Sequence, residues 1–155
     1  MDPLRANEIL ETVREDHELV VEQLGVLEEL ESTLGGDGGP HLDRTLESLR
    51  AASRFFQTKL LPHLQEEEQG LFRLFRDCLP KGSTVVYELE AEHAQMRELC
   101  ERLHEEVALL RHVKNRRAPV FSDLRDLCAR IARLLEQHAE RESTLVEHFL
   151  IPTVH

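Results

Sequence analysis

Apolar residues recur every three or four positions along four segments of the chain, the spacing that places them on one side of an α-helix. The first segment opens with Asp2 and Pro3. An acidic side chain can cap a helix, and a proline at the first helical position loses no hydrogen bond. We expect this helix to run to about Leu34, because the glycine-rich residues 35–39 follow it.

The second helix is expected to begin after Pro40 and to end near Cys78, before the turn-forming residues 79–82. Pro62 lies inside it, directly before His63. Proline has no N–H to donate, and its ring collides with the preceding helical turn. One backbone hydrogen bond is therefore lost, and we expect the helix to bend at this point.

Ser83 is a suitable cap for a third helix, the polar residues 114–119 form a linker, and Pro152 ends a fourth helix. Each helix carries one apolar stripe that is predicted to face the core. The four stripes comprise Leu10, Val13, Val20, Val21, Leu24, Leu27 and Leu34; Leu42, Leu46, Leu49, Phe56, Leu60, Leu71 and Leu74; Leu89, Met96, Cys100, Leu103, Val107 and Leu110; and Leu124, Leu127, Ile131, Leu134, Leu135, Leu145, Val146 and Phe149.

These four helices predict an all-α fold. Short connections between long helices favour antiparallel neighbours, so we expect an up-down-up-down antiparallel four-helix bundle. The absence of tryptophan and the single tyrosine also fit packed helices better than a β-sheet. A chain of 155 residues has the usual length of one domain, and we expect a single domain over residues 1–155.

Charge and composition exclude several classes of function. With 19 basic and 30 acidic residues, the net charge of −11 repels phosphate backbones and anionic membranes, so we expect neither nucleic acid nor membrane as a partner. The first residues lack the basic and apolar regions of a secretory signal, and no apolar stretch approaches the roughly 20 residues of a membrane span. Three widely spaced cysteines without a CxxC motif favour neither disulfides nor a thiolate zinc site. We expect a cytoplasmic protein.

Histidine and glutamate occur in a repeated arrangement. In each half of the chain, one histidine is followed 45 or 46 residues later by a second, which has a glutamate four positions beyond it. Residues at i and i+4 share one face of a helix, and here that face is the apolar stripe. The six residues are His17, His63 and Glu67 in the first half and His93, His138 and Glu142 in the second.

A buried pair of metal ions would explain this arrangement. An ionised carboxylate without a partner costs several kcal/mol to bury, and this core would bury two beside four imidazoles. Carboxylates can bridge two cations about 3.5–4 Å apart, and imidazoles can complete the coordination of each. Any one histidine could instead be an ordinary core residue, and a single HxxxE motif arises by chance in a chain rich in glutamate. The complete repeat favours a dinuclear metal site.

Two assignments remain open at this stage. Glu66 lies three residues after His63 and could also turn inward, but the matching position of the second half is Arg141, which favours Glu67. Glu66 then stays an alternative or outer ligand. Imidazole and carboxylate ligands suit iron, zinc and manganese alike. The remaining histidines lack a carboxylate repeat and are expected at the surface or at helix ends: His41, His104, His112, His148 and His155.

The set of motifs resembles the hemerythrin-like family, also called HHE cation-binding domains, over nearly the whole chain. The resemblance rests on His17, His63-Leu-Gln-Glu-Glu67, Glu92-His93 and His138-Ala-Glu-Arg-Glu142. It implies a non-haem centre of two iron ions, joined by an oxo or hydroxo group. In such a centre His17 and His63 would hold one iron, His93 and His138 the other, and Glu67 and Glu142 would bridge them.

The chain also departs from the oxygen-carrying members of that family. Arg97 stands where they have a further histidine, and Glu142 replaces an aspartate at a longer spacing. The four-histidine, two-glutamate set is closer to the di-iron domains of bacterial iron–sulfur repair proteins, whose extra N-terminal domain we do not expect here. We therefore expect a di-iron protein that binds or reacts with O₂, NO or peroxide. An iron- or oxygen-sensing module with a protein partner and an iron storage or transfer protein are the alternatives, and whether the centre turns over stays open.

Overall fold

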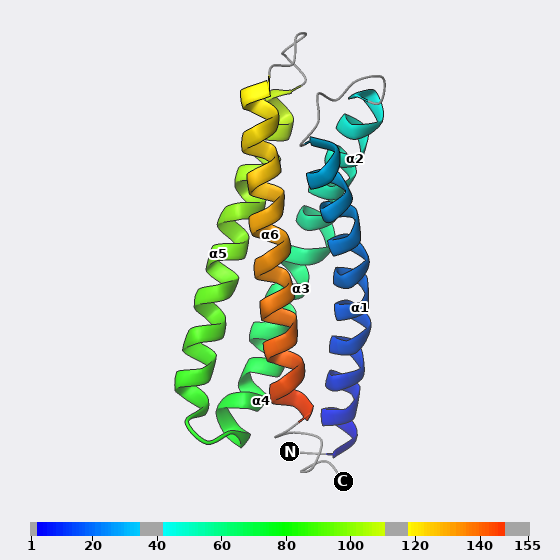
Figure 1. Cartoon of the computed structure of the whole chain (residues 1–155). Coiled ribbons are helices and arrows are strands. Elements are labelled where there is room, and N and C mark those ends of the chain that lie inside the picture. The colour runs from blue at the N-terminus through cyan, green and yellow to red at the C-terminus, as the bar shows by residue number, and fades with distance from the viewer. Residues whose placement is uncertain (1–2, 35–41, 111–117, 148–155) are drawn as a thin grey trace.

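Every element of the computed structural model is a helix in the residues that it describes, which are 3–34, 42–110 and 118–147 (Figure 1). Helix α1 spans Pro3–Leu34. A run of four shorter elements follows: α2 (Leu42–Phe55), the π-helix η2 (Phe56–Leu60), α3 (Leu61–Gln69) and α4 (Leu71–Cys78). Helices α5 (Gly82–Leu109) and α6 (Ala118–Leu145) complete the fold. The elements α2, η2, α3 and α4 follow one another as one long helical arm, and α1, α5 and α6 are the other three arms. The all-α four-helix prediction is therefore confirmed.

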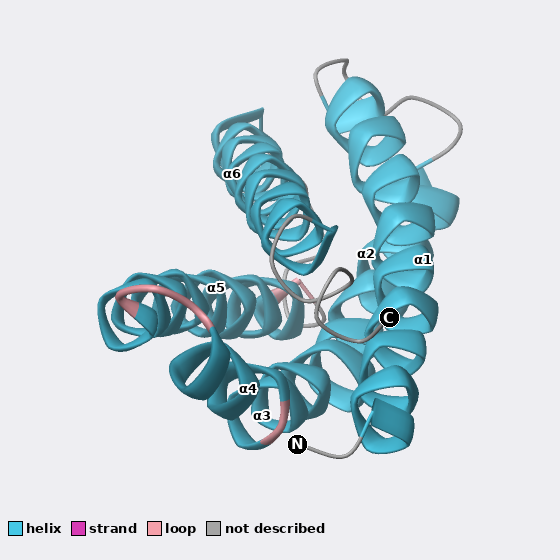
Figure 2. Cartoon of the chain, turned by 90° about the horizontal axis from the view of Figure 1, so that it is seen from below, coloured by secondary structure: helices cyan, strands magenta, loops and turns pink. Residues whose placement is uncertain are grey.

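The four helical arms form a ring of neighbours. Helix α1 packs against α6 and α2, and α5 packs against α6, α2 and α4. Viewed from below in Figure 2, α6 lies between α5 and α1 on one side of the bundle, while α3 and α4 lie between the same two helices on the other side. Successive arms therefore lie side by side and run in opposite directions, as the sequence predicted.

Buried apolar residues form two clusters. One surrounds Phe56 and Leu103 and draws on α1, α2, α5 and α6. The other surrounds Phe72 and Phe75 near the opposite end and includes Leu10 and Val146. Along each arm, the histidines and glutamates of the repeat fall between residues of the first cluster and residues of the second. A polar layer therefore crosses the core between two apolar regions.

Helix α1 begins and ends where the sequence predicted, but one member of its stripe faces outward. Val20 is 5% exposed, whereas Val21 is 59% exposed. Consecutive helical residues lie about 100° apart around the axis, so both valines cannot face the same narrow core. The expectation that Val21 is buried was wrong. Leu30, which the predicted stripe omitted, is 4% exposed and takes the inward position further along.

The second arm departs from regular α-helix just before Pro62 and at Gly70. Just before Pro62, the chain widens into the π-helix, where the N–H of Leu61 donates to the carbonyl of Phe56, five residues earlier. A wider turn separates the proline ring from the carbonyl of Thr58, with which it would collide in a regular α-helix. A second break at Gly70 (φ −113°, ψ −76°) separates α3 from α4, so the prediction of one helix continuing to Cys78 was wrong there.

The turn into α5 depends on close backbone packing. Lys81 has φ 55°, and its carbonyl accepts hydrogen bonds from the N–H groups of Thr84 and Val85. Lys81 thus occupies the cap position, and the prediction that Ser83 caps this helix was wrong. Gly82 is buried beside α4, where an added Cβ would lie 2.4 Å from the carbonyl oxygen of Phe75. Only glycine fits this contact without a shift of the backbone.

Helix α6 begins at Ala118, one residue before Pro119, so the C-terminal end of the predicted linker 114–119 belongs to the helix. Proline is well suited to a first helical turn, since its missing N–H would have no partner there. Some predictions concern residues outside the described part of the structure: the glycine-rich stop at 35–39, the remainder of the linker, Pro152 and the side chains of Val13, Leu34, Leu42 and Phe149.

Candidate metal centre

All four arms contribute to one polar layer. Helix α1 supplies His17, α3 supplies His63 and Glu67, α5 supplies His93, and α6 supplies His138 and Glu142. Five of the six residues are buried, and the side chain of His17 is 14% exposed. The structure therefore brings together every residue that the repeat singled out.

The potential ligand atoms form two groups that share Glu67. One group contains Glu67, His93, His138 and Glu142, and the other contains His17, His63 and Glu67. Within each group, the atoms lie within 4.8 Å of one another. This division pairs His17 with His63 and His93 with His138, as expected for two neighbouring cation positions.

Each carboxylate lies between histidines of the two pairs. Glu67 Oε1 is 3.0 Å from His63 Nε2 and 3.6 Å from His93 Nε2. Glu67 Oε2 is 3.8 Å from His17 Nε2. The ring nitrogen His17 Nε2 donates to Glu142 Oε2 at 2.9 Å, while Glu142 Oε1 contacts His138 Nε2. Both glutamates can therefore reach two cations at once.

Burial and opposite charges act against each other in this layer. Burial favours the neutral imidazole of His17, but hydrogen bonds and the charges of Glu142 and Glu67 raise its pKa to about 9. Burial likewise opposes the charge on His138, yet Glu142 and Glu92 raise its pKa to about 10. Without a cation, protons on the histidines therefore balance the buried carboxylates.

The carboxyl group of Glu67 is also subject to two opposing effects, burial and hydrogen bonding. Burial would raise its pKa, but hydrogen bonding with Glu142 and with His17, His63 and His93 holds the pKa well below its usual value. Glu67 therefore remains an ionised carboxylate inside the bundle. An ionised, buried carboxylate beside several imidazoles is the donor set that a divalent cation requires.

Some buried atoms of the layer make no hydrogen bond within the described part of the chain. They include Glu67 Oε2, Glu142 Oε1 and His93 Nδ1. A buried polar atom without a partner is uncommon in native proteins and calls for an explanation. A cation bound between the two histidine pairs would give Glu67 Oε2 a partner, so the residues present fit a metal centre.

A second set of charged residues supports the histidines from outside the layer. Glu92 Oε1 lies 3.2 Å from His138 Nδ1, and Arg141 in turn lies 3.4 Å from Glu92 Oε1. On the neighbouring side, Glu68 Oε1 lies 3.6 Å from His93 Nδ1 and forms an ion pair with Arg97. A carboxylate on the second ring nitrogen fixes the orientation and tautomer of a ligating histidine.

Sequence reasoning did not assign these supporting roles. Glu68 and Glu92 each stand next to a residue of the layer, about 100° around the helix from it, and that adjacency was the available signal. Arg97 takes part through Glu68 instead of lying in the layer itself. Glu66 is exposed, so of the two glutamates in question it is Glu67 that faces the core.

The histidines outside the repeat have other surroundings. His104 is exposed, as predicted, and makes a hydrogen bond with Ser53. His41, His112, His148 and His155 lie outside the described residues. Cys100 is buried as a small core residue, and burial raises the pKa of its thiol to about 12, which keeps it protonated.

A groove between α1 and α6 leads from the surface to His17. It encloses about 650 Å³ and is lined by His17, Val21 and Ala139 together with the charged residues Arg14, Glu18, Glu136 and Glu140. His17 is thus shared between the buried layer and an open surface groove. Small molecules or ions can approach the layer from this side.

Comparison with known proteins identifies the family. Residues 8–150 match the hemerythrin HHE cation binding domain. Searches of curated proteins and of solved structures found no match. Among the helices that the structure describes, none is long and apolar enough to span a membrane. With its buried histidine and glutamate layer and a family match over most of its length, the chain belongs to the hemerythrin family of HHE cation-binding domains.

Proposed function

We propose that the protein holds two iron ions in the polar layer and binds or reacts with O₂, NO or peroxide there. The observation that carries the proposal is the position of Glu67, which belongs to both groups of potential ligands. His17 and His63 would hold one ion, and His93 and His138 would hold the other. When bound, an iron pair supplies redox chemistry and coordination positions that small ligands can occupy.

The donor count supports two ions in place of one. The layer offers four imidazole nitrogens and four carboxylate oxygens, all contributed by the six residues described above. Metals such as iron prefer about six ligands, so eight donor atoms exceed the needs of one ion and leave two ions with vacant positions. If Glu67 and Glu142 bridge the two ions, each ion receives two imidazole nitrogens and two carboxylate oxygens.

The surrounding residues control access to the layer. Apolar clusters lie on both sides of it along the bundle, and His93 packs against the ring of Phe72 with centroids 4.8 Å apart. These contacts limit the entry of water. The groove that reaches His17 gives a small ligand a direct approach from one side. The layer is thus shielded along the bundle axis but accessible between α1 and α6.

Metal analysis combined with spectroscopy tests this proposal. We expect the purified chain, loaded with ferrous iron and exposed to air, to hold two irons per chain and to show a charge-transfer absorption. Azide, NO or peroxide should change that spectrum. A maximum of one iron per chain would contradict the two-ion centre. An unchanged spectrum with all three ligands would instead favour the storage alternative.

A further inference from the structure

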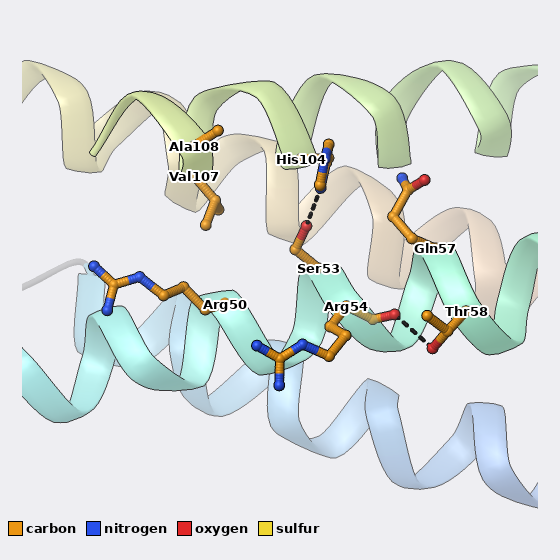
Figure 3. A pocket seen from close by; sticks show the side chains of 8 residues that line it. All are labelled: Arg50, Ser53, Arg54, Gln57, Thr58, His104, Val107 and Ala108. Carbon is orange, nitrogen blue, oxygen red and sulfur yellow. Dashed lines mark hydrogen bonds between the residues drawn. The ribbon is translucent and has the colours of Figure 1, made fainter. Parts of the chain in front are cut away.

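A second cavity lies away from the metal layer, between the α2–η2 segment and α5 (Figure 3). It encloses about 350 Å³. Ser53 at its inner wall stands ten residues before His63 on the same arm, which corresponds to roughly 15 Å along a helix axis. The cavity is therefore separate from the residues proposed to hold metal.

The inner wall carries an unusual polar pair. Ser53 is 4% exposed, and outside the metal layer it is the one buried polar side chain in the described part of the chain. Its Oγ lies 3.2 Å from Nδ1 of His104, which reaches down from α5 (Figure 3). Apolar side chains alone could pack the contact between α2 and α5, so packing does not require a hydroxyl and an imidazole there. The Ser53–His104 pair therefore places a hydroxyl and an imidazole at the wall of the cavity.

The outer wall is cationic. Arg50 and Arg54 line the cavity one helical turn apart on α2, and Figure 3 shows both side chains extending in the same direction along that helix. Neither forms an ion pair with any described residue. No described carboxylate lines the cavity, although the chain carries a net charge of −11. The cavity is thus locally positive on an acidic protein.

The donors come from both helices. The Gln57 amide extends from η2 toward α5, and His104 extends from α5 toward α2 (Figure 3). The Thr58 hydroxyl donates instead to the carbonyl of Arg54 at 2.8 Å, so its hydrogen is already used. Two arginines, one amide and the Ser53–His104 pair therefore line the cavity. Guanidinium and amide N–H groups donate hydrogen bonds to oxyanions, and a guanidinium can donate two to the same group.

We propose that this cavity binds the phosphate group of a small phosphate ester. Guanidinium groups make paired, charge-assisted hydrogen bonds to phosphate oxygens, and Arg50 and Arg54 are placed to do so. The volume exceeds that of a bare phosphate ion and lies in the range of about 300–1,000 Å³ typical of small-molecule sites. Val107 and Ala108 provide a wall for the less polar remainder of the molecule.

Calorimetric titration of the purified full chain tests the site. The probes are ribose 5-phosphate, inorganic phosphate and succinate at one fixed ionic strength. We expect saturable binding of ribose 5-phosphate, weaker binding of inorganic phosphate and weaker still of succinate. Equal affinity for the two phosphates would overturn the assignment to an ester. Equal or tighter binding of succinate, or no saturable binding of ribose 5-phosphate, would overturn the phosphate site.

Matched variants locate the binding. Combining Arg50→Ala with Arg54→Ala should weaken ribose 5-phosphate binding by roughly tenfold or more, because charge-assisted hydrogen bonds are lost. Ser53→Ala should weaken it less. Combining Arg73→Ala with Arg133→Ala removes the same charge from exposed positions outside the cavity and should leave binding unchanged. Equal losses in the two double variants, with helix content and metal content preserved, would overturn the proposal.

Discussion

The Nε2 atoms of His93 and His138 lie 2.9 Å apart, although the two residues come from different helices. Nitrogen ligands at about 2.0–2.1 Å from a metal ion, and at a right angle to each other, are roughly 3 Å apart. The two rings already have this spacing. One ring nitrogen donates a hydrogen bond to the other when no cation lies between them. Metal binding at this pair therefore requires the loss of a proton and little movement of the rings.

Substitution of the shared carboxylates should remove metal. Glu67→Ala and Glu142→Ala each delete a side chain that contacts histidines of both pairs. We expect the metal content of either variant, measured by elemental analysis after saturating loading and desalting, to fall well below two ions per chain. Glu66→Ala and Glu140→Ala serve as controls, since both residues are exposed. An equal loss in all four variants would mean that general negative charge, and not bridging, retains the metal.

Loss of a carboxylate that orients a ligating histidine should weaken metal binding without abolishing it. Glu92 lies 3.2 Å from Nδ1 of His138 and orients that ring. Glu92→Ala should therefore weaken metal affinity about 10–100-fold, the usual range for such supporting residues. Competition with a chelator of known affinity measures the change. Glu98→Ala is the control, because Glu98 is exposed on the same helix. Unchanged metal affinity in the Glu92 variant would show that Glu92 does not orient His138 for metal binding.

The sequence was sufficient for the bundle and for the residues of its polar layer. Apolar periodicity defined the four arms, and the duplicated spacing of histidine and glutamate marked the positions that meet in the core. Both signals are local, since a helix fixes which residues share a face. The assignment of Glu67 over Glu66 depended on comparing the two halves, and the structure places Glu67 inside and Glu66 outside.

Features that depend on contacts between helices could not be read from the sequence. The cap at Lys81 lies where α4 meets α5, beside the close contact of Gly82 with Phe75, and Val21 faces outward because Val20 takes the inward position. The supporting pair Glu92 and His138 joins residues 46 positions apart on different helices. Periodicity along one helix carries no information about such pairs.

Stability of the metal-free protein should fall as the pH rises. The folded state raises the pKa of His17 to about 9 and that of His138 to about 10, above the value of about 6.5 for an unfolded histidine. The resulting stabilisation is complete below pH 6.5 and is lost as the pH rises through the folded values. Each histidine can contribute a loss of up to about 1.4 kcal/mol per pH unit in that window.

Urea unfolding at pH 6 and pH 8 measures this effect, and the upper pH stays below the pKa of about 8.5 of an exposed cysteine thiol. The metal-loaded protein is the comparison. Because ligating imidazoles must be deprotonated, its stability should not fall over the same interval. Equal or greater stability of the metal-free protein at pH 8 would show that protonated His17 and His138 do not balance the buried carboxylates.

Two glycine substitutions should have opposite effects. Gly82→Ala would place a Cβ 2.4 Å from the carbonyl oxygen of Phe75, so α4 and α5 must move apart. We expect the free energy of unfolding to decrease by about 1–3 kcal/mol. Gly25→Ala places a methyl group in open space on α1, where alanine favours a helix by roughly 0.5–1 kcal/mol. Urea unfolding of both variants gives the two values. A neutral Gly82→Ala would show that the contact relaxes freely.

Blocking the groove between α1 and α6 should slow entry to the metal layer. Val21 lines this groove, is 59% exposed and lies one helical turn beyond His17. Val21→Trp places a large ring across the opening without disturbing buried packing. We expect the uptake of ferrous iron by metal-free protein, followed by stopped-flow absorbance, to slow several-fold while the final metal content stays the same.

The control for this substitution is Leu109→Trp, which changes a residue that is 63% exposed near the end of α5 and does not line the groove. It should leave the uptake rate unchanged. A rate in Val21→Trp equal to that of the unmodified protein would mean that ions enter by another route, such as local opening of the bundle. A lower final metal content would instead mean that the ring disturbs His17 itself, and a smaller change, Val21→Leu, would then be needed to separate access from coordination.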